Sequence, residues 1–317
     1  MTTLAKGLKM VRVLPERRAV VTGVTVGRAR KEVLPRPRRP LRVDRVVRRT
    51  ALYIALFAGS ILALLPLLWM LSTSLKPDSK IMAFPPQWFP SPVTWAHYGE
   101  VFSGSPLGLW FENTGIITVT TVVGATASSS LVAYGFARLR ARGNKPLFWL
   151  LLSTMMMPGI VLLLPQFIMF SYIHWTDTFL PLIVPSFFAY PFYVFLLRQF
   201  FMSFPVELED AAKMDGVGWF RMWWRMIVPN AKAVHATVAV FQFMTAWNDF
   251  MAPYVYLTSS NKMTLALGTN YFLGVHTAEW GALMAFSCII VLPMLVAFAF
   301  SQRFFVRSIS TAGFGGR

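Results

Sequence analysis

Few side chains in this sequence could carry acid–base, nucleophilic or metal chemistry, and those few are not grouped. The histidines lack the H-x-x-x-H and H-E-x-x-H spacings of metal sites; they are His97, His174, His235 and His276. The single cysteine, Cys288, lies in an apolar run, where a small core residue is the ordinary interpretation. We therefore predict no catalytic residue and no metal site.

Acidic residues between apolar segments offer one enzymatic interpretation. Asp78, Glu100 and Asp177 could serve a membrane-embedded enzyme such as a lipid-linked glycosyl transferase, but no paired-carboxylate or D-x-D pattern joins them. The G-x-x-x-x-G-K-[ST] motif, whose backbone cradles nucleotide phosphates, does not occur. We therefore expect no cofactor in this chain and keep an enzyme as an alternative only.

One polar stretch stands out, residues 207–229, ELEDAAKMDGVGWFRMWWRMIVP, which is too short and too polar to cross a bilayer. Pro205 suits the first turn of a helix, and the acids that follow it favour the positive end of the helix dipole. Gly216 should end this helix in a left-handed conformation. Residues 219–228 should form a second short helix that Pro229 stops.

This stretch has two possible environments outside the hydrocarbon. Ala211 and Ala212 leave the first helix with a shallow face, around which a groove of another protein could close. Alternatively, the stretch lies on the lipid with tryptophans as headgroup anchors. Those tryptophans are Trp219, Trp223 and Trp224. Both interpretations can hold in part, since anionic lipid would repel the acidic half.

The composition places the chain in a membrane. Of its 317 residues, 56% are hydrophobic and 14% are charged, which is improbable for a soluble domain of this length. Six segments are long and apolar enough to cross a bilayer as helices. They are residues 50–72, 113–136, 147–170, 180–201, 233–257 and 281–302. We therefore predict an all-α polytopic protein with six transmembrane helices, several of them kinked by proline.

The second of these segments is rich in glycine, serine and threonine, from Thr114 to Ser130. Small residues let helix backbones approach closely in membrane proteins. We therefore expect this span to lie inside the bundle.

The distribution of basic residues predicts the orientation. Alternate loops divide the Lys and Arg residues very unequally, with 27 of the 30 on one side and only Lys76, Lys80 and Lys262 on the other. Both termini and the polar stretch are thus predicted to be cytoplasmic. Residues 1–49 hold half of the Lys and Arg and form a basic cytoplasmic tail suited to anionic lipid, ahead of a membrane domain at 50–317. Because most positive charge is explained by topology, we expect no nucleic-acid partner.

The polar stretch carries a family resemblance. Its pattern D-A-A-x-x-D-G-V, followed after eight residues by M-I-V-P, resembles the EAA loop of bacterial ABC importer permeases, usually E-A-A-x-x-D-G-A, eight residues, I-x-L-P. The departures are Asp210 for the usual Glu, with Glu209 just before it, and Met226 and Val228 for Ile and Leu. Either Glu209 or Asp210 could make the family's ionic contact.

Other segments resemble the maltose-type carbohydrate permeases. They are an outer loop (74–102), the second and third spans (133–167), a W-N-x-F stretch (245–258) and a short glycine-rich end, STAGFGGR. The resemblance covers nearly all of residues 50–317. It implies an inner-membrane subunit of an ATP-driven importer of sugars or sugar-like solutes, with residues 205–229 as the coupling loop.

The resemblance also implies partners. ATP and Mg would be bound by a separate ATPase dimer, a second related permease would complete the pathway, and an extracytoplasmic solute-binding protein would deliver substrate. The residues that would couple to the ATPase are Glu209, Asp210, Ala211, Ala212, Asp215 and Gly216. A self-contained secondary transporter is a further alternative, but no convincing internal repeat supports it. The residues do not specify the solute.

Two polar residues inside the fifth apolar segment are candidates for the substrate pathway. A charge at the centre of a transmembrane helix costs about 2.5–3.5 kcal/mol on insertion scales, so Asn248 and Asp249 should face protein or water. One hypothesis is that they line the route, with Trp247 offering a stacking face to a sugar ring. The other is that Asp249 is a structural hydrogen-bonding residue near the interface.

Overall fold

The computed structural model describes residues 42–139, 141–274 and 279–312, and every regular element in these ranges is helical. Residues 1–41 of the predicted basic tail and most of the glycine-rich end lie outside them. The α-helices are α1 (Arg42–Ser74), α2 (Asp78–Ile81), α3 (Ala96–Gly104), α4 (Leu107–Arg138), α5 (Asn144–Ser153), α6 (Gly159–Tyr172), α7 (Leu180–Ile183), α8 (Pro191–Phe201), α9 (Val206–Met214), α10 (Trp219–Met222), α11 (Val228–Asn230), α12 (Lys232–Trp247), α13 (Met251–Tyr256), α14 (Leu265–Gly268) and α15 (Trp280–Ala312). Short 3₁₀ turns are η1 (Thr154–Met156), η2 (Val184–Phe188), η4 (Ser260–Lys262) and η5 (Thr269–Leu273), and η3 (Trp223–Ile227) is a π-helix.

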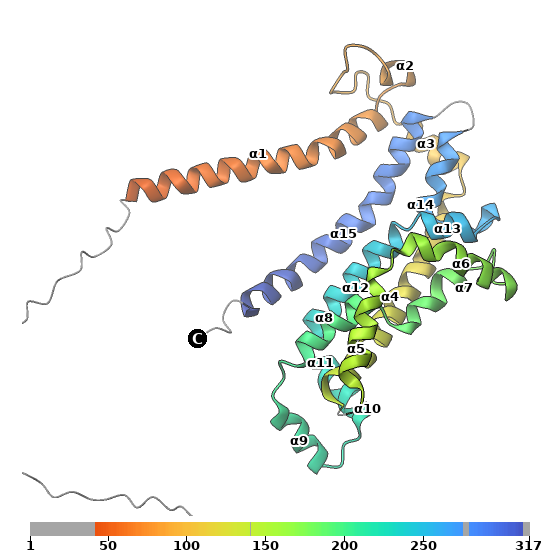
Figure 1. The fold of residues 1–317 in the computed structure, drawn as a ribbon. Coiled ribbons are helices and arrows are strands. Elements are labelled where there is room, and N and C mark those ends of the chain that lie inside the picture. Colours follow the sequence, from red (N-terminus) through yellow and green to blue (C-terminus); the bar gives the residue numbers. More distant parts are fainter. Residues whose placement is uncertain (1–41, 140, 275–278, 313–317) are drawn as a thin grey trace, which may run out of the picture. The chain divides into compact units, whose positions relative to one another are not determined.

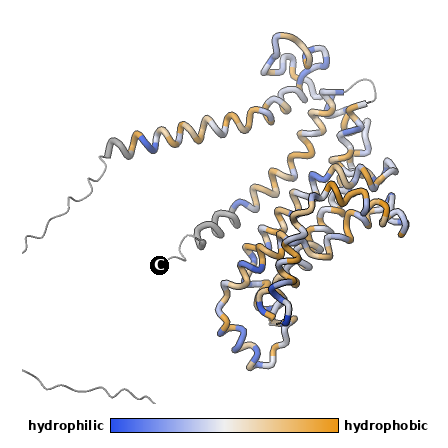
Figure 2. The backbone as a smooth tube through the Cα atoms, viewed as in Figure 1, coloured by the Kyte–Doolittle hydropathy of each residue, from blue (hydrophilic) through white to orange (hydrophobic). Residues whose placement is uncertain are grey.

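The chain divides into two units, residues 1–59 and 60–317. In the first unit, the described residues 42–59 form the beginning of α1, so residues 42–49 of the predicted tail are helical. The second unit holds the rest of α1 and the other helices, of which α4 and α15 are long and largely apolar (Figures 1 and 2).

Four helices in the described ranges satisfy the length and hydropathy of a membrane span. They cover Val46–Ser74, Leu107–Arg138, Leu180–Phe201 and Trp280–Gln302. A fifth span is possible if the pair Asn144–Met156 and Gly159–Tyr172 counts as one, bent by 96° at Pro158. Proline at this break lacks the N–H that a continuous helix needs, and the kink expected from the sequence is present there.

The fifth predicted span, residues 233–257, is divided into α12 and α13, and α12 is only 16 residues long. The break falls at Asn248 and Asp249. The Asn248 side chain donates to the carbonyl of Met244 (2.8 Å), and Asp249 Oδ1 accepts from the N–H of Ala252 (3.2 Å). The Asp249 carboxylate therefore satisfies a backbone N–H in the first turn of α13, and Asn248 adds a second donor to a carbonyl that already accepts from its own N–H.

Helix α4 is the centre of the second unit, as its small residues predict. It packs against α8, α12 and η2, and it is the most buried of the four spans. At Gly124 an added Cβ would lie 2.7 Å from Ser186 Oγ and 2.8 Å from the Phe187 ring, so only glycine allows η2 to approach this closely.

Two apolar clusters hold the helices around α4. One includes Tyr134, Leu197 and Phe201, and the other includes Trp110 and Phe286. Within this unit α9 lies at one end and α2 and α3 lie at the other (Figure 1). Hydrophilic segments occur at both of these ends, and hydrophobic segments predominate between them (Figure 2).

Candidate functional site

The polar stretch folds as a bent helical segment, which we call the elbow (residues 205–230). Its first helix, α9, begins after Pro205, and its end is closed by two backbone bonds. Gly216 N–H donates to Lys213 O (3.0 Å) and Val217 N–H donates to Ala212 O (3.0 Å), with Gly216 at φ +72°. This is a Schellman closure, and it confirms that Gly216 ends the helix.

The second half of the elbow corrects one expectation. Helix α10 passes into the π-helix η3 and then into α11, so the chain stays helical through Pro229 to Asn230. Pro229 does not stop the helix because it falls in the first turn of α11, after the wider π turn, where a missing N–H is tolerated.

The acids on α9 have different environments. Glu209 is the buried residue of α9, and its Oε1 lies 2.9 Å from Nε of Arg138, the last residue of α4. The Glu209 and Arg138 side chains are only 4% and 6% exposed. Arg138 also donates from Nη2 to the carbonyls of Phe204 (2.8 Å) and Phe201. Glu209 therefore faces the body of its own chain.

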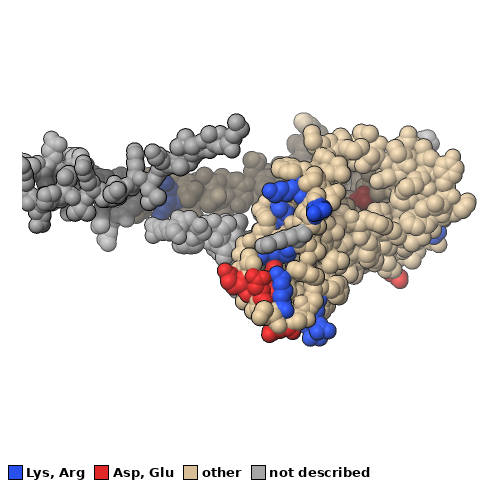
Figure 3. Space-filling model, turned by 60° about the horizontal axis from the view of Figure 1, so that its bottom comes forward, with Lys and Arg blue, Asp and Glu red and all other residues tan. Residues whose placement is uncertain are grey.

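The other predicted coupling residues lie on the surface of the elbow. Asp210 is exposed and pairs with Lys213 at 2.9 Å. Ala211, Asp215 and Gly216 are exposed as well, and Ala212 is half-buried. In Figure 3 acidic and basic side chains gather at the end of the molecule that carries α9. Of the acids considered for an ionic contact, only Asp210 is accessible to another protein.

The tryptophan half of the elbow is attached to two other helices. Trp223 is 6% exposed, and its Nε1–H donates to Ser130 Oγ of α4 at 3.0 Å. Ser130 lies 2.7 Å from Nε2 of His235 on α12, and His235 Nδ1 lies 2.8 Å from the carbonyl of Ala231. With Nδ1–H donating to that carbonyl, Nε2 accepts from the serine hydroxyl. Each donor in the series Trp223, Ser130 and His235 therefore has an acceptor. Trp223 is thus a core residue and not a headgroup anchor.

Trp219 and Trp224 remain available for lipid or protein contact. They are 45% and 59% exposed, and Phe220 beside them is 66% exposed. The elbow thus has an exposed aromatic side at its second half.

A groove of about 1090 Å³ opens beside α9. Its walls come from α9 and from the segment after α4, and its exposed charges include Lys145, Asp210 and Lys213. The groove brings the loop between α4 and α5 to the elbow, a proximity that spacing in the sequence did not predict.

The three candidate pathway residues differ in what they face. Trp247 is 4% exposed, its Nε1–H donates to Ile290 O (3.1 Å), and its ring contacts those of Phe111 and Phe243. Asn248 is exposed. Asp249 lines a small cavity of about 80 Å³ between α4, α12 and α13. The polar residues around this cavity are Thr114, Thr121, Tyr190, Gln242, Thr245 and Thr264.

A family model described as "Binding-protein-dependent transport system inner membrane component" matches residues 121–311, which include the elbow. The chain belongs to this family. Its members are transport components of the inner membrane, so the chain is a permease subunit and not a glycosyl transferase.

Curated relatives agree over nearly their whole length. The permease is 31% identical to the inner membrane ABC transporter permease protein YcjP of Escherichia coli, over 86% of this chain and 98% of that one. It is 30% identical to AraQ of Bacillus subtilis, an arabinooligosaccharides transport system permease, over 85% and 97% of the two chains. A diacetylchitobiose uptake permease of Streptomyces coelicolor, NgcG, is 28% identical over 82% and 86%.

Solved structures show the same fold. A chain of a bacterial ABC transporter involved in the import of the acidic polysaccharide alginate superposes with a TM-score of 0.73 at 21% identity, covering 84% of this permease and 98% of that chain. A second structure, the alginate ABC transporter in complex with a pentasaccharide-bound periplasmic protein, gives a TM-score of 0.60 at 16% identity, with the same coverage. The all-α importer-permease fold predicted from the sequence is therefore confirmed.

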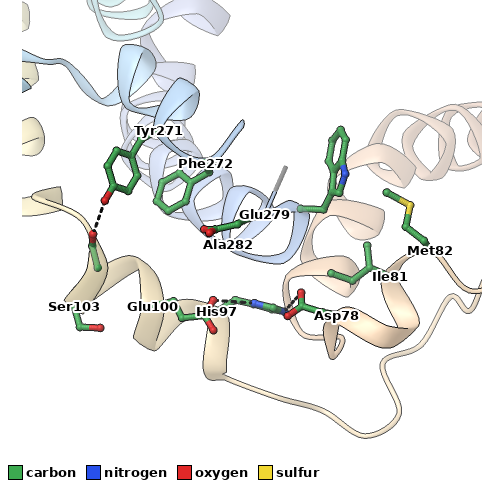
Figure 4. A pocket seen from close by; sticks show the side chains of 12 residues that line it. Asp78, Ile81, Met82, His97, Glu100, Ser103, Tyr271, Phe272, Glu279 and Ala282 are labelled. Carbon is green, nitrogen blue, oxygen red and sulfur yellow. Dashed lines mark hydrogen bonds and ion pairs between the residues drawn. The ribbon is translucent and has the colours of Figure 1, made fainter. Parts of the chain in front are cut away.

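The far end of the permease holds acids that spacing in the sequence left isolated. His97 on α3 is buried, with Nε2 at 2.8 Å from Lys76 O and 3.7 Å from Asp78, and Nδ1 at 3.3 Å from Glu100. Asp78, His97 and Glu100 line a cavity of about 600 Å³ together with Glu279 (Figure 4). Asp78 and Glu100 therefore flank one histidine, whereas Asp177 belongs to a separate contact.

Asp177 joins the segment after α6 to the segment after α13. Its carboxylate accepts from the N–H groups of Thr258 (3.0 Å) and Ser259 (2.9 Å), from Ser259 Oγ (2.6 Å) and from Lys262 Nζ (2.9 Å). These donors, the Ser259 hydroxyl first, hold the pKa of Asp177 well below its ordinary range. These contacts explain Asp177 as a structural residue that connects the two segments, so no catalytic role is needed to account for it.

Proposed function

We propose that this permease imports a sugar or sugar-like solute and is driven by a separate ATPase dimer that docks on the elbow. The observation that carries the proposal is α9 itself. It is a helix closed at its end by the Gly216 turn, it exposes Asp210 and Asp215, and it is fixed to α4 through Glu209. A rigid helix that is held at its base can pass a movement of its partner to the spans, whereas a flexible loop would absorb it.

The class of solute is proposed from the relatives. Among the curated relatives are permeases for arabinooligosaccharides, diacetylchitobiose and sn-glycerol-3-phosphate. All of these solutes carry hydroxyl groups. A hydroxyl-rich solute would suit the polar cavity at Asp249, which threonine, tyrosine and glutamine side chains surround. We therefore propose Asp249 as a pathway residue, and propose that Trp247 supports it by packing.

The orientation and the partners follow from this proposal. The elbow and both termini would be cytoplasmic, which agrees with the 27-to-3 division of the 30 Lys and Arg residues. The ATPase would bind ATP and Mg and would meet Asp210, Ala211 and Ala212. A second permease would complete the pathway, and an extracytoplasmic binding protein would deliver the solute to the end that carries α2 and α3. Lipid would surround the apolar spans.

Co-purification tests the docking step. The full-length permease carrying an affinity tag is expressed together with its ATPase, second permease and binding protein, and the ATPase retained per permease is measured. We expect Asp210→Lys to lower the retained ATPase about tenfold, because it reverses a charge at the proposed contact. Glu112→Lys is the matched control, since Glu112 is an exposed acid near the opposite end of α4. Equal retention in the two variants would contradict docking on α9.

A further inference from the structure

Arg138 holds three elements together at the base of the elbow. It ends α4, and its Nε lies 2.9 Å from Glu209 Oε1 of α9. Its Nη2 donates to the carbonyl of Phe201, the last residue of α8, and to the carbonyl of Phe204 in the link from α8 to α9. The guanidinium is planar and has five donors in a fixed arrangement, so these contacts fix its orientation as well as its position.

The burial of this ion pair gives it an effect that a surface pair lacks. The side chains of Arg138 and Glu209 are 6% and 4% exposed, and Glu209 is the buried residue of α9. Removing one partner would leave an uncompensated buried charge, which is strongly unfavourable. By contrast, the pair Asp210–Lys213 has side chains that are 64% and 40% exposed, and such pairs contribute little.

We propose that Arg138 and Glu209 are positioning residues for energy coupling. This inference rests on the proposed docking of an ATPase on α9. Their ion pair fixes the angle of α9 to α4, so that movement of the docked helix turns α4 instead of bending the link. This assigns different roles to the adjacent acids: Glu209 contacts the permease's own α4, and Asp210 contacts the ATPase. The resemblance to the EAA loop alone did not separate these roles.

The test measures coupling separately from assembly. The full complex is reconstituted in vesicles of phosphatidylethanolamine and phosphatidylglycerol. MgATP hydrolysis is measured without and with the cognate binding protein as purified, and the ratio is the stimulation. For Glu209→Gln we expect the ATPase to stay bound and basal hydrolysis to persist, while stimulation falls about fivefold or more, within the usual size of coupling between sites. Glu207→Gln, an exposed acid on the same helix, should keep the wild-type stimulation.

A second variant guards against simple misfolding. Arg138→Met with Glu209→Met removes both charges but keeps side chains of similar length, a replacement that buried pairs often tolerate. We expect this double variant to assemble, and to show the same loss of stimulation. Unchanged stimulation in it, or loss of bound ATPase to the same extent as in Asp210→Lys, would overturn the positioning role.

The failure of the docking proposal would look different. Asp210→Lys and Glu112→Lys would then retain equal amounts of ATPase. The angle of α9 is measured independently from the distance between spin labels at Leu208→Cys and Leu131→Cys, with Cys288→Ser, in nanodiscs. Leu208 and Leu131 are exposed residues of α9 and α4. A distance distribution that is as narrow in Glu209→Gln as in the parent would also overturn the inference.

Discussion

Trp223 Nε1 donates to Ser130 Oγ of α4 at 3.0 Å. This bond attaches the second half of the elbow to α4, and the ion pair of Glu209 with Arg138 attaches the first half to the same helix. The two attachment points on α4, Ser130 and Arg138, are separated by about two helical turns. A helix held at two points by its neighbour moves with it. The elbow is therefore part of the α4 assembly and not an independent linker between α8 and α12.

Replacing Trp223 with Phe should weaken this attachment. The variant keeps most of the buried ring but removes the donor to Ser130, so we expect a loss of about 1 kcal/mol of stability. The thermal unfolding midpoint of the detergent-solubilised permease measures it. Trp224→Phe is the control, because Trp224 is 59% exposed and its midpoint should not change. Equal midpoints for the two variants would show that the bond is not stabilising.

The local chemistry of the elbow could be predicted from the sequence because its signals are short-range. Pro205 and Gly216 bracket α9 as proline and glycine do in many helices, and both ends agree with the structure. Pro229 was misread because a π turn, which has no strong sequence signal, changes where the proline falls. Apolar length likewise predicted four of the six spans as helices long enough to cross a membrane, but it did not predict where polar side chains interrupt the fifth segment.

Replacing Gly281 with Ala should disturb the outer end of the permease. A Cβ at this position would lie 2.2 Å from His97 Nε2, and the buried ring is already held at 2.8 Å from Lys76 O. Overpacking of this kind costs about 1–3 kcal/mol. Gly99→Ala on α3 is the matched control, since nothing lies within 4 Å of its added Cβ. The two unfolding midpoints should differ clearly, and a Gly281→Ala midpoint as high as that of the control would contradict the contact.

Contacts between distant residues could not be predicted in this way. Glu209 and Asp210 are neighbours in the sequence and equally acidic, yet one is buried against Arg138 and the other is exposed. The difference depends on where α4 ends in space. The carboxylate of Asp177 likewise meets donors more than 80 residues later. A single sequence shows the residue types but not these pairings.

Asp177→Asn should loosen the connection between the two outer segments. The amide would keep one oxygen for the N–H groups of Thr258 and Ser259 but would lose the charge that faces Lys262. Hydrogen bonds to charged groups are worth about 1.5–3 kcal/mol, so we expect a loss of about 2 kcal/mol. The unfolding midpoint measures it, with Glu112→Gln as the control. An unchanged midpoint would show that the charge does not matter.

The same variant gives a pH dependence with a definite sign. The pKa of Asp177 is lowered from its ordinary value of 3.8 in the folded state, so its stabilising contribution is complete above that value. It is lost as the pH falls through the folded-state pKa. The midpoint difference between wild type and Asp177→Asn should therefore be constant from about pH 8 to about pH 5 and should shrink only in stronger acid. If the midpoint difference disappeared near neutral pH, the stabilisation would have to come from the titration of another group.

Asp249 has two possible roles that two substitutions separate. Its Oδ1 accepts from the N–H of Ala252, which an asparagine oxygen could still do, and it lines the small polar cavity. If Asp249 contacts the solute, Asp249→Asn should keep the wild-type unfolding midpoint but lower uptake about tenfold, because a hydrogen bond to a charged group is lost. Uptake by whole cells is measured with arabinooligosaccharides, diacetylchitobiose and sn-glycerol 3-phosphate as probes. Asp249→Ala should lower both quantities. Wild-type uptake in Asp249→Asn, with a loss only in Asp249→Ala, would reduce Asp249 to a structural residue at the break between α12 and α13.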